Sequence, residues 1–377
     1  MPEKKSPWIR NRGLGRLVAR ETNLSDLLQF LTDRDPSPWE RLVGFVPEDV
    51  TREALGANRA DLLLTTRARS AVVEVKLGHL MSVKQQQDYE ALGVDSELYL
   101  AALSSDEIRL ATNSDRWTFL SLSEVVSCWE HVEDDFTRLL AREAASILRE
   151  WDQMISGVFQ PRTSGTHAPL SVLTQKHLAR VVTRRVAQDL RMRDRLAYAG
   201  VTSGGGLPLV AAWTPIRGEG KDRTFMAEIR WWQTKPGGEL RFGVDFDPRP
   251  DGEEDDEVRR AAYDLARSMD VEIQYASLRD HLIDAWPGLA ELLRRDKPSR
   301  PKAKGEWEQV ITHGFKGAPL AGGKKNTRRQ TSPDFFGDGT LRFQAIADID
   351  FEQASAIDVT GLIDATLEYL SSRQPEH

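Results

Sequence analysis

The stretch that most constrains the fold runs from Asp61 to Lys76 and reads DLLLTTRARSAVVEVK. It consists of two short apolar segments joined by a polar turn, with an acid at its start and Glu74-Val75-Lys76 near its end. Side chains alternate between the two faces of a β-strand, so Glu74 and Lys76 point to one face and Val75 to the other. The pattern predicts a β-hairpin that carries a carboxylate and an ammonium group on the same face.

The register of this hairpin decides how its charges meet. If the loop comprises the four residues Arg67 to Ser70, Asp61 lies opposite Lys76 and diagonal to Glu74, with roughly 7 to 8 Å between the backbones of the two acids. Carboxylates at that spacing can converge on one cation. On an otherwise apolar sheet they repel each other and lose hydration unless a metal ion or a lysine neutralises them. We therefore expect a metal ion, the lysine or both beside the two acids.

The hairpin is flanked by two segments with helical patterns. Glu21 stands at the start of TNLSDLLQFL, in which leucines recur at helical spacing. After the hairpin, Ser82 is a predicted N-cap, Gln85 and Tyr89 lie one turn apart, and Gly93 ends the pattern. These segments predict a helix with an acid at its beginning, and a second helix that holds Gln85 near the strand ends.

In this order, Glu21, Asp61, Glu74-Val75-Lys76 and the run from Gln85 to Tyr89 resemble the PD-(D/E)XK nuclease superfamily. The Gln-x-x-x-Tyr spacing is typical of its RecB-like and defence-associated branch. A role in bacterial antiviral defence or DNA processing is what this resemblance implies.

The resemblance covers residues 15–125 and implies a restriction-endonuclease-like core with the element order αβββαβ. The chain departs from the family motif at one position, because Ala60 stands where the proline of the family name is expected. The resemblance does not extend to residues 160–377.

The resemblance also implies a metal site. Asp61, Glu74 and the backbone carbonyl of Val75 would hold Mg²⁺, with Mn²⁺ as a substitute, and Glu21 would complete the shell or bind a second ion. Mg²⁺ is a hard cation that takes oxygen ligands, usually one or two carboxylates together with water and substrate phosphates. The implied reaction is hydrolysis of DNA phosphodiester bonds, leaving a 5′-phosphate and a 3′-hydroxyl.

The other implied catalytic residues are Lys76 and Gln85. Lys76 would orient or deprotonate the attacking water, or offset negative charge as it develops. Gln85 would position the substrate or the lysine, and Tyr89 would support it.

Each of these residues has a structural alternative. Acids and bases alternate on many solvent-facing strands, so Glu74 and Lys76 alone do not define a site. Gln85 is also explained by a capping box with Ser82, Glu21 by the helix dipole, and Tyr89 by the core. Two other functions stay open, a catalytically inactive nuclease-like binding or scaffold module and an RNA-cleaving enzyme.

A chain of 377 residues exceeds what one core usually organises, so we expect more than one domain. The predicted parts are a nuclease-like domain over 1–130, a connecting helix over 131–159, a linker over 160–169 and an α+β domain over 170–377. Recognition, sensing or assembly is the expected role of the last part.

Within this last part, alternation and turn residues predict an antiparallel meander over 207–215, 223–234 and 239–247. A helix over 255–268, a strand over 271–276 and a helix over 278–295 interrupted at Pro287 follow. A strand over 341–350 and a helix over 359–372 complete the prediction.

The net charge is −7 and the isoelectric point is about 5.7, which argues against a chain that is basic overall. Nucleic-acid binding must then depend on local patches. The run 175–196 predicts a helix with one apolar and one basic face, and a solvated arginine-rich helix is the alternative. The segments 294–307 and 322–331 are basic and are predicted first as solvated loops. The candidate phosphate-binding residues are Lys84, Arg180, Arg184 and Arg191.

Other classes of protein are disfavoured. The sequence has no apolar run of membrane-spanning length and no signal-peptide pattern, so we expect a cytoplasmic protein that does not bind membranes. The single cysteine, Cys128, excludes internal disulfides, and the histidines lack zinc-ligand spacing. The sequence contains no Walker-type phosphate-binding loop, so we do not expect a nucleotide-driven motor in this chain. Because an acidic chain would gain a basic channel by association, we expect a homo-oligomer or a partner subunit.

Overall fold

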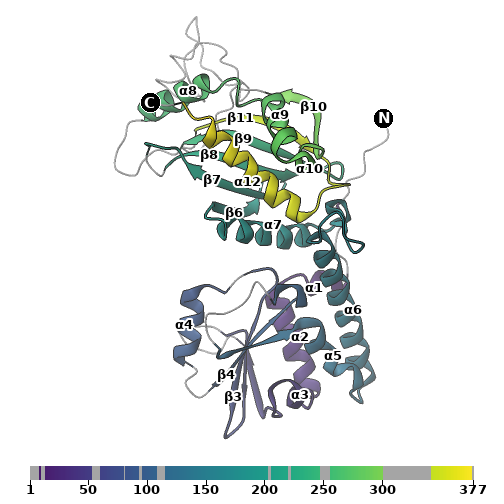
Figure 1. The fold of residues 1–377 in the computed structure, drawn as a ribbon. Helices are drawn as coiled ribbons and strands as arrows, with labels where there is room; N and C mark the ends of the chain where they lie inside the picture. The colour runs from purple at the N-terminus through teal and green to yellow at the C-terminus, as the bar shows by residue number, and fades with distance from the viewer. Residues whose placement is uncertain are drawn as a thin grey trace, which may run out of the picture. The chain divides into compact units, whose positions relative to one another are not determined.

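The protein is mixed α/β, with one mixed and one antiparallel β-sheet (Figure 1). The structure is a computed structural model, and it describes residues 8–9, 13–52, 60–79, 81–92, 96–107, 115–202, 205–219, 222–246, 255–299 and 341–375. The chain divides into two compact units. We call them the N-terminal unit, Trp8–Gly157 with Gln175–Val182, and the C-terminal unit, which contains Val158–Thr174 and Thr183–His377.

The N-terminal unit is built on a five-stranded sheet with the order β1-β2-β3-β4-β5. The first three strands are antiparallel neighbours, and β3, β4 and β5 run parallel. The strands are β1 Asp49–Arg52, β2 Leu62–Thr65, β3 Ser70–Val75, β4 Ser96–Ala102 and β5 Trp117–Ser121.

The helices of this unit follow the predicted apolar spacing. In α2 the side chains of Leu24, Leu28 and Leu31 are fully buried, as the leucine repeat predicted. The long helix predicted over 131–159 is confirmed as α6. The helices are α1 Leu14–Leu17, α2 Glu21–Arg34, α3 Trp39–Val43, α4 Val83–Leu92, α5 Leu122–Ser127 and α6 Asp135–Val158, with 3₁₀ turns at Ser104–Asp106 and Cys128–His131.

The predicted hairpin is present, but its register differs from the expected one. Leu62 pairs with Val73 and Thr65 with Ser70, so the loop is 66–69 and not Arg67 to Ser70. Thr66 closes this loop, because its N–H donates to Arg69 O (2.8 Å) and its hydroxyl accepts from Arg69 N (2.9 Å). Continued by one residue, this register places Asp61 opposite Glu74 and not opposite Lys76. The shift is two residues, so every side chain keeps its predicted face.

The C-terminal unit is built on a six-stranded antiparallel sheet with the order β10-β11-β9-β8-β7-β6. The predicted meander is confirmed by β7, β8 and β9, which pair consecutively. The strand β6 was missed, because the charged run RMRDR before it continued the helical pattern. The strands are β6 Leu196–Val201, β7 Pro208–Pro215, β8 Arg223–Trp231, β9 Gly238–Phe246, β10 Leu293–Ser299 and β11 Leu341–Ile349.

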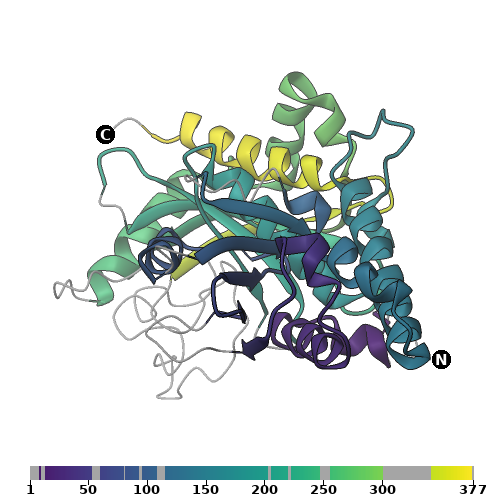
Figure 2. The ribbon, with the colours of Figure 1, turned by 90° about the horizontal axis from the view of Figure 1, so that it is seen from below.

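One face of this sheet is apolar and is covered by helices. Phe225, Phe242 and Phe343 lie on it with no exposed surface. Figures 1 and 2 show α12 running across the strands, and it contacts β7 and β8, while α8 contacts β9 and β11. The helices are α7 Lys176–Arg191, α8 Asp255–Ser268, α9 Tyr275–Ala285, α10 Pro287–Ala290 and α12 Ala356–Ser372, with a 3₁₀ turn at Leu170–Val172.

Two predicted elements of this unit are wrong. Residues 271–276 form turns and the start of α9, since the Ile273 N–H bonds Met269 O and closes the end of α8. The helix predicted over 278–295 restarts at Pro287 as expected, but it ends at Ala290. The next residues form β10, because Leu293 pairs with Ile349.

Residues 160–169, the expected linker, lie in the C-terminal unit. There Arg162 donates from Nη2 to Gly288 O (2.6 Å) and its Nε lies 3.3 Å from Asp358 Oδ2. The basic segment 322–331 and residues 300–307 lie outside the described residues. In the part of the chain that is described, no helix is both long and apolar enough to cross a membrane.

Candidate active site

The predicted charges meet where β3 extends beyond the start of β2. On the β4 side of β3, the Lys76 N–H donates to Ala101 O (2.9 Å). On the other side, carboxylates accept the neighbouring N–H groups: Val75 N donates to Asp61 Oδ2 (2.8 Å) and Leu77 N donates to Glu21 Oε1 (2.7 Å). The two acids therefore take the place of the strand partner that β2 no longer supplies.

Glu74 is the centre of this cluster and is 2% exposed. Its Oε1 accepts from Lys76 Nζ (2.5 Å) and from Gln85 Nε2 (2.7 Å), and its Oε2 accepts from the Tyr89 hydroxyl (2.8 Å). The predicted sharing of one face by Glu74 and Lys76 thus gives a direct ion pair. Both oxygens of Glu74 are held by neighbouring side chains.

The helix α4 supplies Gln85 and Tyr89 from positions one turn apart. The hydroxyl of Ser82 accepts from Gln85 N (3.1 Å), so Ser82 caps the helix as predicted. The Gln85 side chain does not complete a capping box, because its amide reaches Glu74 and lies 3.4 Å from the Tyr89 hydroxyl. Tyr89 is 2% exposed and is both a core residue and a donor to Glu74.

This cluster contains three carboxylates and one ammonium group, and the pKa values of Asp61 and Lys76 are both raised. Burial, and next the charge of Glu74, raises the pKa of Asp61 to about 6, against smaller opposing effects of the Val75 N–H, Lys76 and Ser25. For Lys76, burial alone lowers the pKa, but Glu74, and after it Glu21 and Asp61, outweigh burial and raise it above its usual value. Burial and then Glu74 raise the pKa of Tyr89. Three carboxylates and one ammonium group leave an excess of negative charge when all are ionised.

The carboxylates of this cluster could bind a hard divalent cation such as Mg²⁺ only if the side chain of Lys76 moved away from Glu74. Among the described residues, no three His, Cys, Asp or Glu side chains are arranged to hold a metal ion. The ammonium of Lys76 bonds Glu74, while Asp61 and Glu21 each use one carboxylate oxygen to accept a backbone N–H. Asp61 Oδ1 and Glu21 Oε2 are the oxygens that suit Mg²⁺. Glu74 would join them only if Lys76 moved aside.

The candidate phosphate-binding residues lie on two helices, α4 and α7. Lys84 is exposed on α4, next to Gln85. On α7, which lies within the helix predicted over 175–196, Arg180 and Arg184 are half-buried. Arg191 is exposed, and its Nε and Nη2 donate to Ala197 O (3.0 and 2.7 Å) at the start of β6.

Sequence reasoning missed Ser25, which lies one turn after Glu21 in α2. Its side chain is fully buried, its hydroxyl donates to Glu21 O (3.0 Å), and its polarity lowers the pKa of Asp61. The signal was present, because position 25 follows Glu21 by four residues and therefore shares its helix face.

A second buried charge cluster in the C-terminal unit was also missed. Arg342 donates to Glu228 Oε2 (3.2 Å) and to Asp245 Oδ2 (2.8 Å), Arg230 pairs with Glu228, and Trp213 Nε1 donates to Asp245 Oδ2 (2.7 Å). Asp245 and Arg342 are directly opposite each other on β9 and β11. Alternating charges in β8, β9 and β11 were visible in the sequence, but the cluster follows only once the strand register is known.

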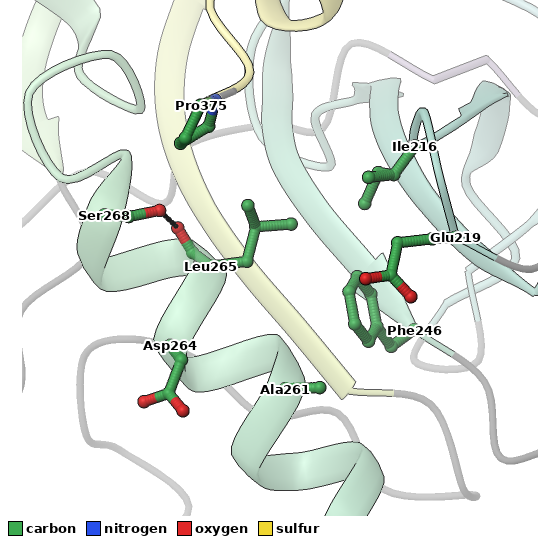
Figure 3. A pocket seen from close by; sticks show the side chains of 8 residues that line it. All are labelled: Ile216, Glu219, Phe246, Ala261, Asp264, Leu265, Ser268 and Pro375. Carbon is green, nitrogen blue, oxygen red and sulfur yellow. Dashed lines mark hydrogen bonds between the residues drawn. The ribbon is translucent and has the colours of Figure 1, made fainter. Parts of the chain in front are cut away.

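A cavity of about 350 Å³ lies between α8 and the sheet of the C-terminal unit (Figure 3). Its walls are mainly apolar, with Leu265 and Ala261 from α8 facing Ile216 and Phe246. The carboxylate of Glu219 lies beside the ring of Phe246 and is paired with Arg223 Nη1 at 2.7 Å. The cavity does not include any of the predicted catalytic residues.

Comparison of the chain with protein-family models, with curated proteins and with solved structures gave no match in any of the three.

Proposed function

We propose that the N-terminal unit is a Mg²⁺-dependent endonuclease that hydrolyses phosphodiester bonds of DNA. The observation that carries the proposal is the buried cluster in which the ammonium of Lys76 lies 2.5 Å from Glu74 with Asp61 and Glu21 beside them. A site with more carboxylates than cations, next to an amine, suits a reaction in which a metal ion and phosphate oxygens bind together.

The order of elements supports the same proposal. From Glu21 to Ala102 the chain runs α2, β1, β2, β3, α4, β4, with the short helix α3 between α2 and β1, which fits the order αβββαβ implied by the resemblance to PD-(D/E)XK nucleases. Glu74, Val75 and Lys76 lie at the end of the third strand, and Gln85 and Tyr89 lie on the following helix. This placement of the motif residues supports the proposal.

In the proposed reaction, Asp61, Glu74 and Glu21 would hold Mg²⁺, together with the carbonyl of Val75. When bound there, Mg²⁺ would supply a Lewis acid for the phosphodiester and for a water molecule. Lys76 leaves Glu74 and orients the attacking water or offsets the charge that develops on the phosphate. Gln85 and Tyr89 keep Glu74 in place through their hydrogen bonds to it, and the exposed Lys84 on α4 would bind the substrate backbone.

A scaffold function is the second candidate, and a specific observation favours it. Both oxygens of Glu74 are already bonded, and Asp61 and Glu21 each accept a backbone N–H, so the cluster also works as a structural support for the end of β3. In that case the charges stabilise a nuclease-like binding module without catalysis.

Cleavage assays separate the candidates. The purified chain is incubated with plasmid, linear duplex, single-stranded DNA and RNA in the presence of Mg²⁺ or Mn²⁺, beside Glu74→Gln and Lys76→Ala. Glu352→Gln, which alters an exposed acid of the C-terminal unit, is the matched control. We expect DNA cleavage by the wild type and the control only. Cleavage that survives both active-site substitutions contradicts the proposal, absence of cleavage on every substrate supports the scaffold, and cleavage of RNA alone supports the ribonuclease alternative.

A further inference from the structure

The cavity between α8 and the sheet of the C-terminal unit has the dimensions of a small-molecule site. Its volume is about 350 Å³. Ligand pockets usually measure about 300 to 1,000 Å³, and they are lined mainly by apolar side chains with a few polar groups. Every lining residue belongs to the C-terminal unit, so the shape of the cavity is set within that unit. The proposed nuclease function uses none of these residues.

The helix α8 forms one wall of the cavity. Its residues Ala262, Ala266 and Met269 follow helical spacing and are buried. Ala261 and Leu265 lie one turn apart on the neighbouring strip of the helix, and they are only half-buried although both are apolar. The buried strip holds α8 in the core, and the neighbouring strip is left to line the cavity.

The facing wall comes from the sheet and from the residues after α12. Phe246 ends β9 and Ile216 follows β7, and each is 2% exposed. Pro375 follows α12 and also lines the cavity. The neighbours of these residues hold each other, because Gln374 Oε1 accepts from Arg217 N (2.9 Å) and Gln374 Nε2 donates to Arg217 O (2.8 Å). The cavity is therefore formed by the fold before any ligand binds.

The polar groups of the lining are mainly acidic. The described lining residues include the carboxylates of Glu219 and Asp264 and the hydroxyl of Ser268, but neither a lysine nor an arginine. Asp264 and Ser268 are exposed, so the cavity opens to solvent beside them. Glu219 is half-buried, and its Oε2 accepts from Arg223 Nη1 (2.7 Å). A carboxylate can accept several hydrogen bonds, so Glu219 can accept from a ligand as well.

The charge at the cavity decides which ligand fits. Two carboxylates and the guanidinium of Arg223 leave one excess negative charge, which disfavours an anion. A protonated amine can donate a charge-assisted hydrogen bond to Glu219, and such bonds are stronger than those between neutral groups. The apolar body of the same molecule would contact Phe246 and Leu265, which face each other across the cavity (Figure 3).

We propose that this cavity binds a small organic cation, which consists of an apolar body and one protonated amine, with Glu219 as the acceptor. The C-terminal unit thereby has a small-molecule site of its own. This inference does not depend on whether the N-terminal unit cleaves DNA.

Methyl NMR of the full chain tests the proposal with three probes of similar size and different charge: phenethylammonium, phenethyl alcohol and hydrocinnamate. The Cδ1 methyl of Ile216 reports on the cavity. The methyl of Ile363, which is buried in α12 and does not line the cavity, is the reference. We expect a saturable shift of the Ile216 signal with phenethylammonium. Hydrocinnamate should bind at least about tenfold more weakly, because it cannot donate to the carboxylate.

Two variants locate the binding. Glu219→Gln removes the charge at nearly constant size, so it should weaken the binding of phenethylammonium about tenfold and leave that of phenethyl alcohol unchanged. Ala261→Phe fills the cavity from α8 and should abolish the binding of all three probes. The matched controls are Glu352→Gln, at an exposed acid, and Ala276→Phe, at an exposed alanine of α9, and both should bind as the wild type does.

Several results overturn the proposal. They are the absence of a saturable Ile216 shift with phenethylammonium, equal affinity for the cation and the anion, and a Glu219→Gln variant that binds phenethylammonium as the wild type does or loses both phenethyl probes equally. Thermal unfolding shows which variants fold. If Ala261→Phe does not fold, the Ile216 signal of the wild type still locates the probe, and the Glu219→Gln result decides.

Discussion

Each unit of the protein buries a cluster of charged side chains on its sheet, and the two clusters differ in balance. In the C-terminal unit, the carboxylates of Glu228 and Asp245 meet the guanidinium groups of Arg230 and Arg342. In the N-terminal unit, the ammonium of Lys76 is the one cation among the described side chains that lowers the pKa of Asp61, whereas Glu21, Asp61 and Glu74 all act on Lys76 as acids.

The difference in charge balance between the two clusters indicates which of them is structural and which is a candidate functional site. Acids that are matched by arginines are neutralised within the fold, so the C-terminal cluster needs no further ion. In the N-terminal cluster, burial, and next the charge of Glu74, raises the pKa of Asp61 to about 6, so ionising this carboxylate in the folded chain costs free energy. A perturbed pKa in an unbalanced cluster is a marker of a functional site, whereas a balanced ion network is a structural feature.

The largest expected effect is on the rate of DNA cleavage, which should depend on the N-terminal cluster and not on the C-terminal cluster. Removing the amine in Lys76→Ala should lower the rate of cleavage by about 10²- to 10⁴-fold, because it removes the group that orients or deprotonates water. Arg230→Ala, which removes a cation from the balanced cluster, should leave the rate unchanged. Single-turnover cleavage of a labelled duplex measures both, and equal losses in the two variants would remove the distinction.

The free energy of unfolding should depend more on the C-terminal cluster than on the N-terminal cluster. Arg342→Met leaves Asp245 and Glu228 buried with one cation fewer and should lower the free energy of unfolding by about 3 to 5 kcal/mol. Lys76→Met should cost less, because the remaining acids can bind a proton or a divalent ion, and Mn²⁺ should restore part of the loss. Urea denaturation with and without Mn²⁺ measures these changes. A small effect of Arg342→Met, or no rescue of Lys76→Met, contradicts the comparison.

The pH dependence of stability gives a sharper test of Asp61. Its pKa is about 6 in the folded chain, against 3.8 for an unperturbed aspartate, so its protonated form favours folding. The contribution is fully present below the unfolded pKa and is lost as the pH rises through about 6. Without metal ions, Asp61→Asn should therefore be more stable than the wild type by about 2 kcal/mol at pH 8, and the gap should close near pH 4. Thermal unfolding across this range measures the gap, and a constant gap would argue against a raised pKa.

The smallest expected effect comes from removing the hydrogen bond that the Tyr89 hydroxyl donates to Glu74. Tyr89→Phe keeps the ring in the core but removes one hydrogen bond to the carboxylate, which should cost about 1 kcal/mol of stability. Cleavage should fall less than in Lys76→Ala, because the hydroxyl positions Glu74 and does not contact the reacting atoms. Denaturant titration and cleavage rates measure the two effects. A loss of cleavage as large as that of Lys76→Ala would move Tyr89 into the reaction itself.

Much of the N-terminal unit could be predicted from the sequence because its signals are local. Strand alternation placed Glu74 and Lys76 on one face, and helical spacing placed Gln85 and Tyr89 one turn apart. The register of the hairpin could not be predicted, since it depends on whether Ser70 joins the loop or the strand. The hydrogen bonds of Thr66 with Arg69 decide that point.

The C-terminal unit shows the same division between local and distant causes. Turn residues predicted β7 to β9, and Pro287 predicted the helix restart. The end of that helix was wrong because Leu293 pairs with Ile349, more than fifty residues further along the chain.

The central claim is that the excess of acids at the end of β3 binds a divalent cation. Calorimetric titration of the wild-type chain with Mn²⁺ tests it most directly, beside Asp61→Asn and the matched Asp245→Asn from the balanced cluster. The account predicts saturable binding to the wild type and to Asp245→Asn, and binding about tenfold weaker or more in Asp61→Asn. No saturable binding to the wild type, or equal binding to all three proteins, would contradict it.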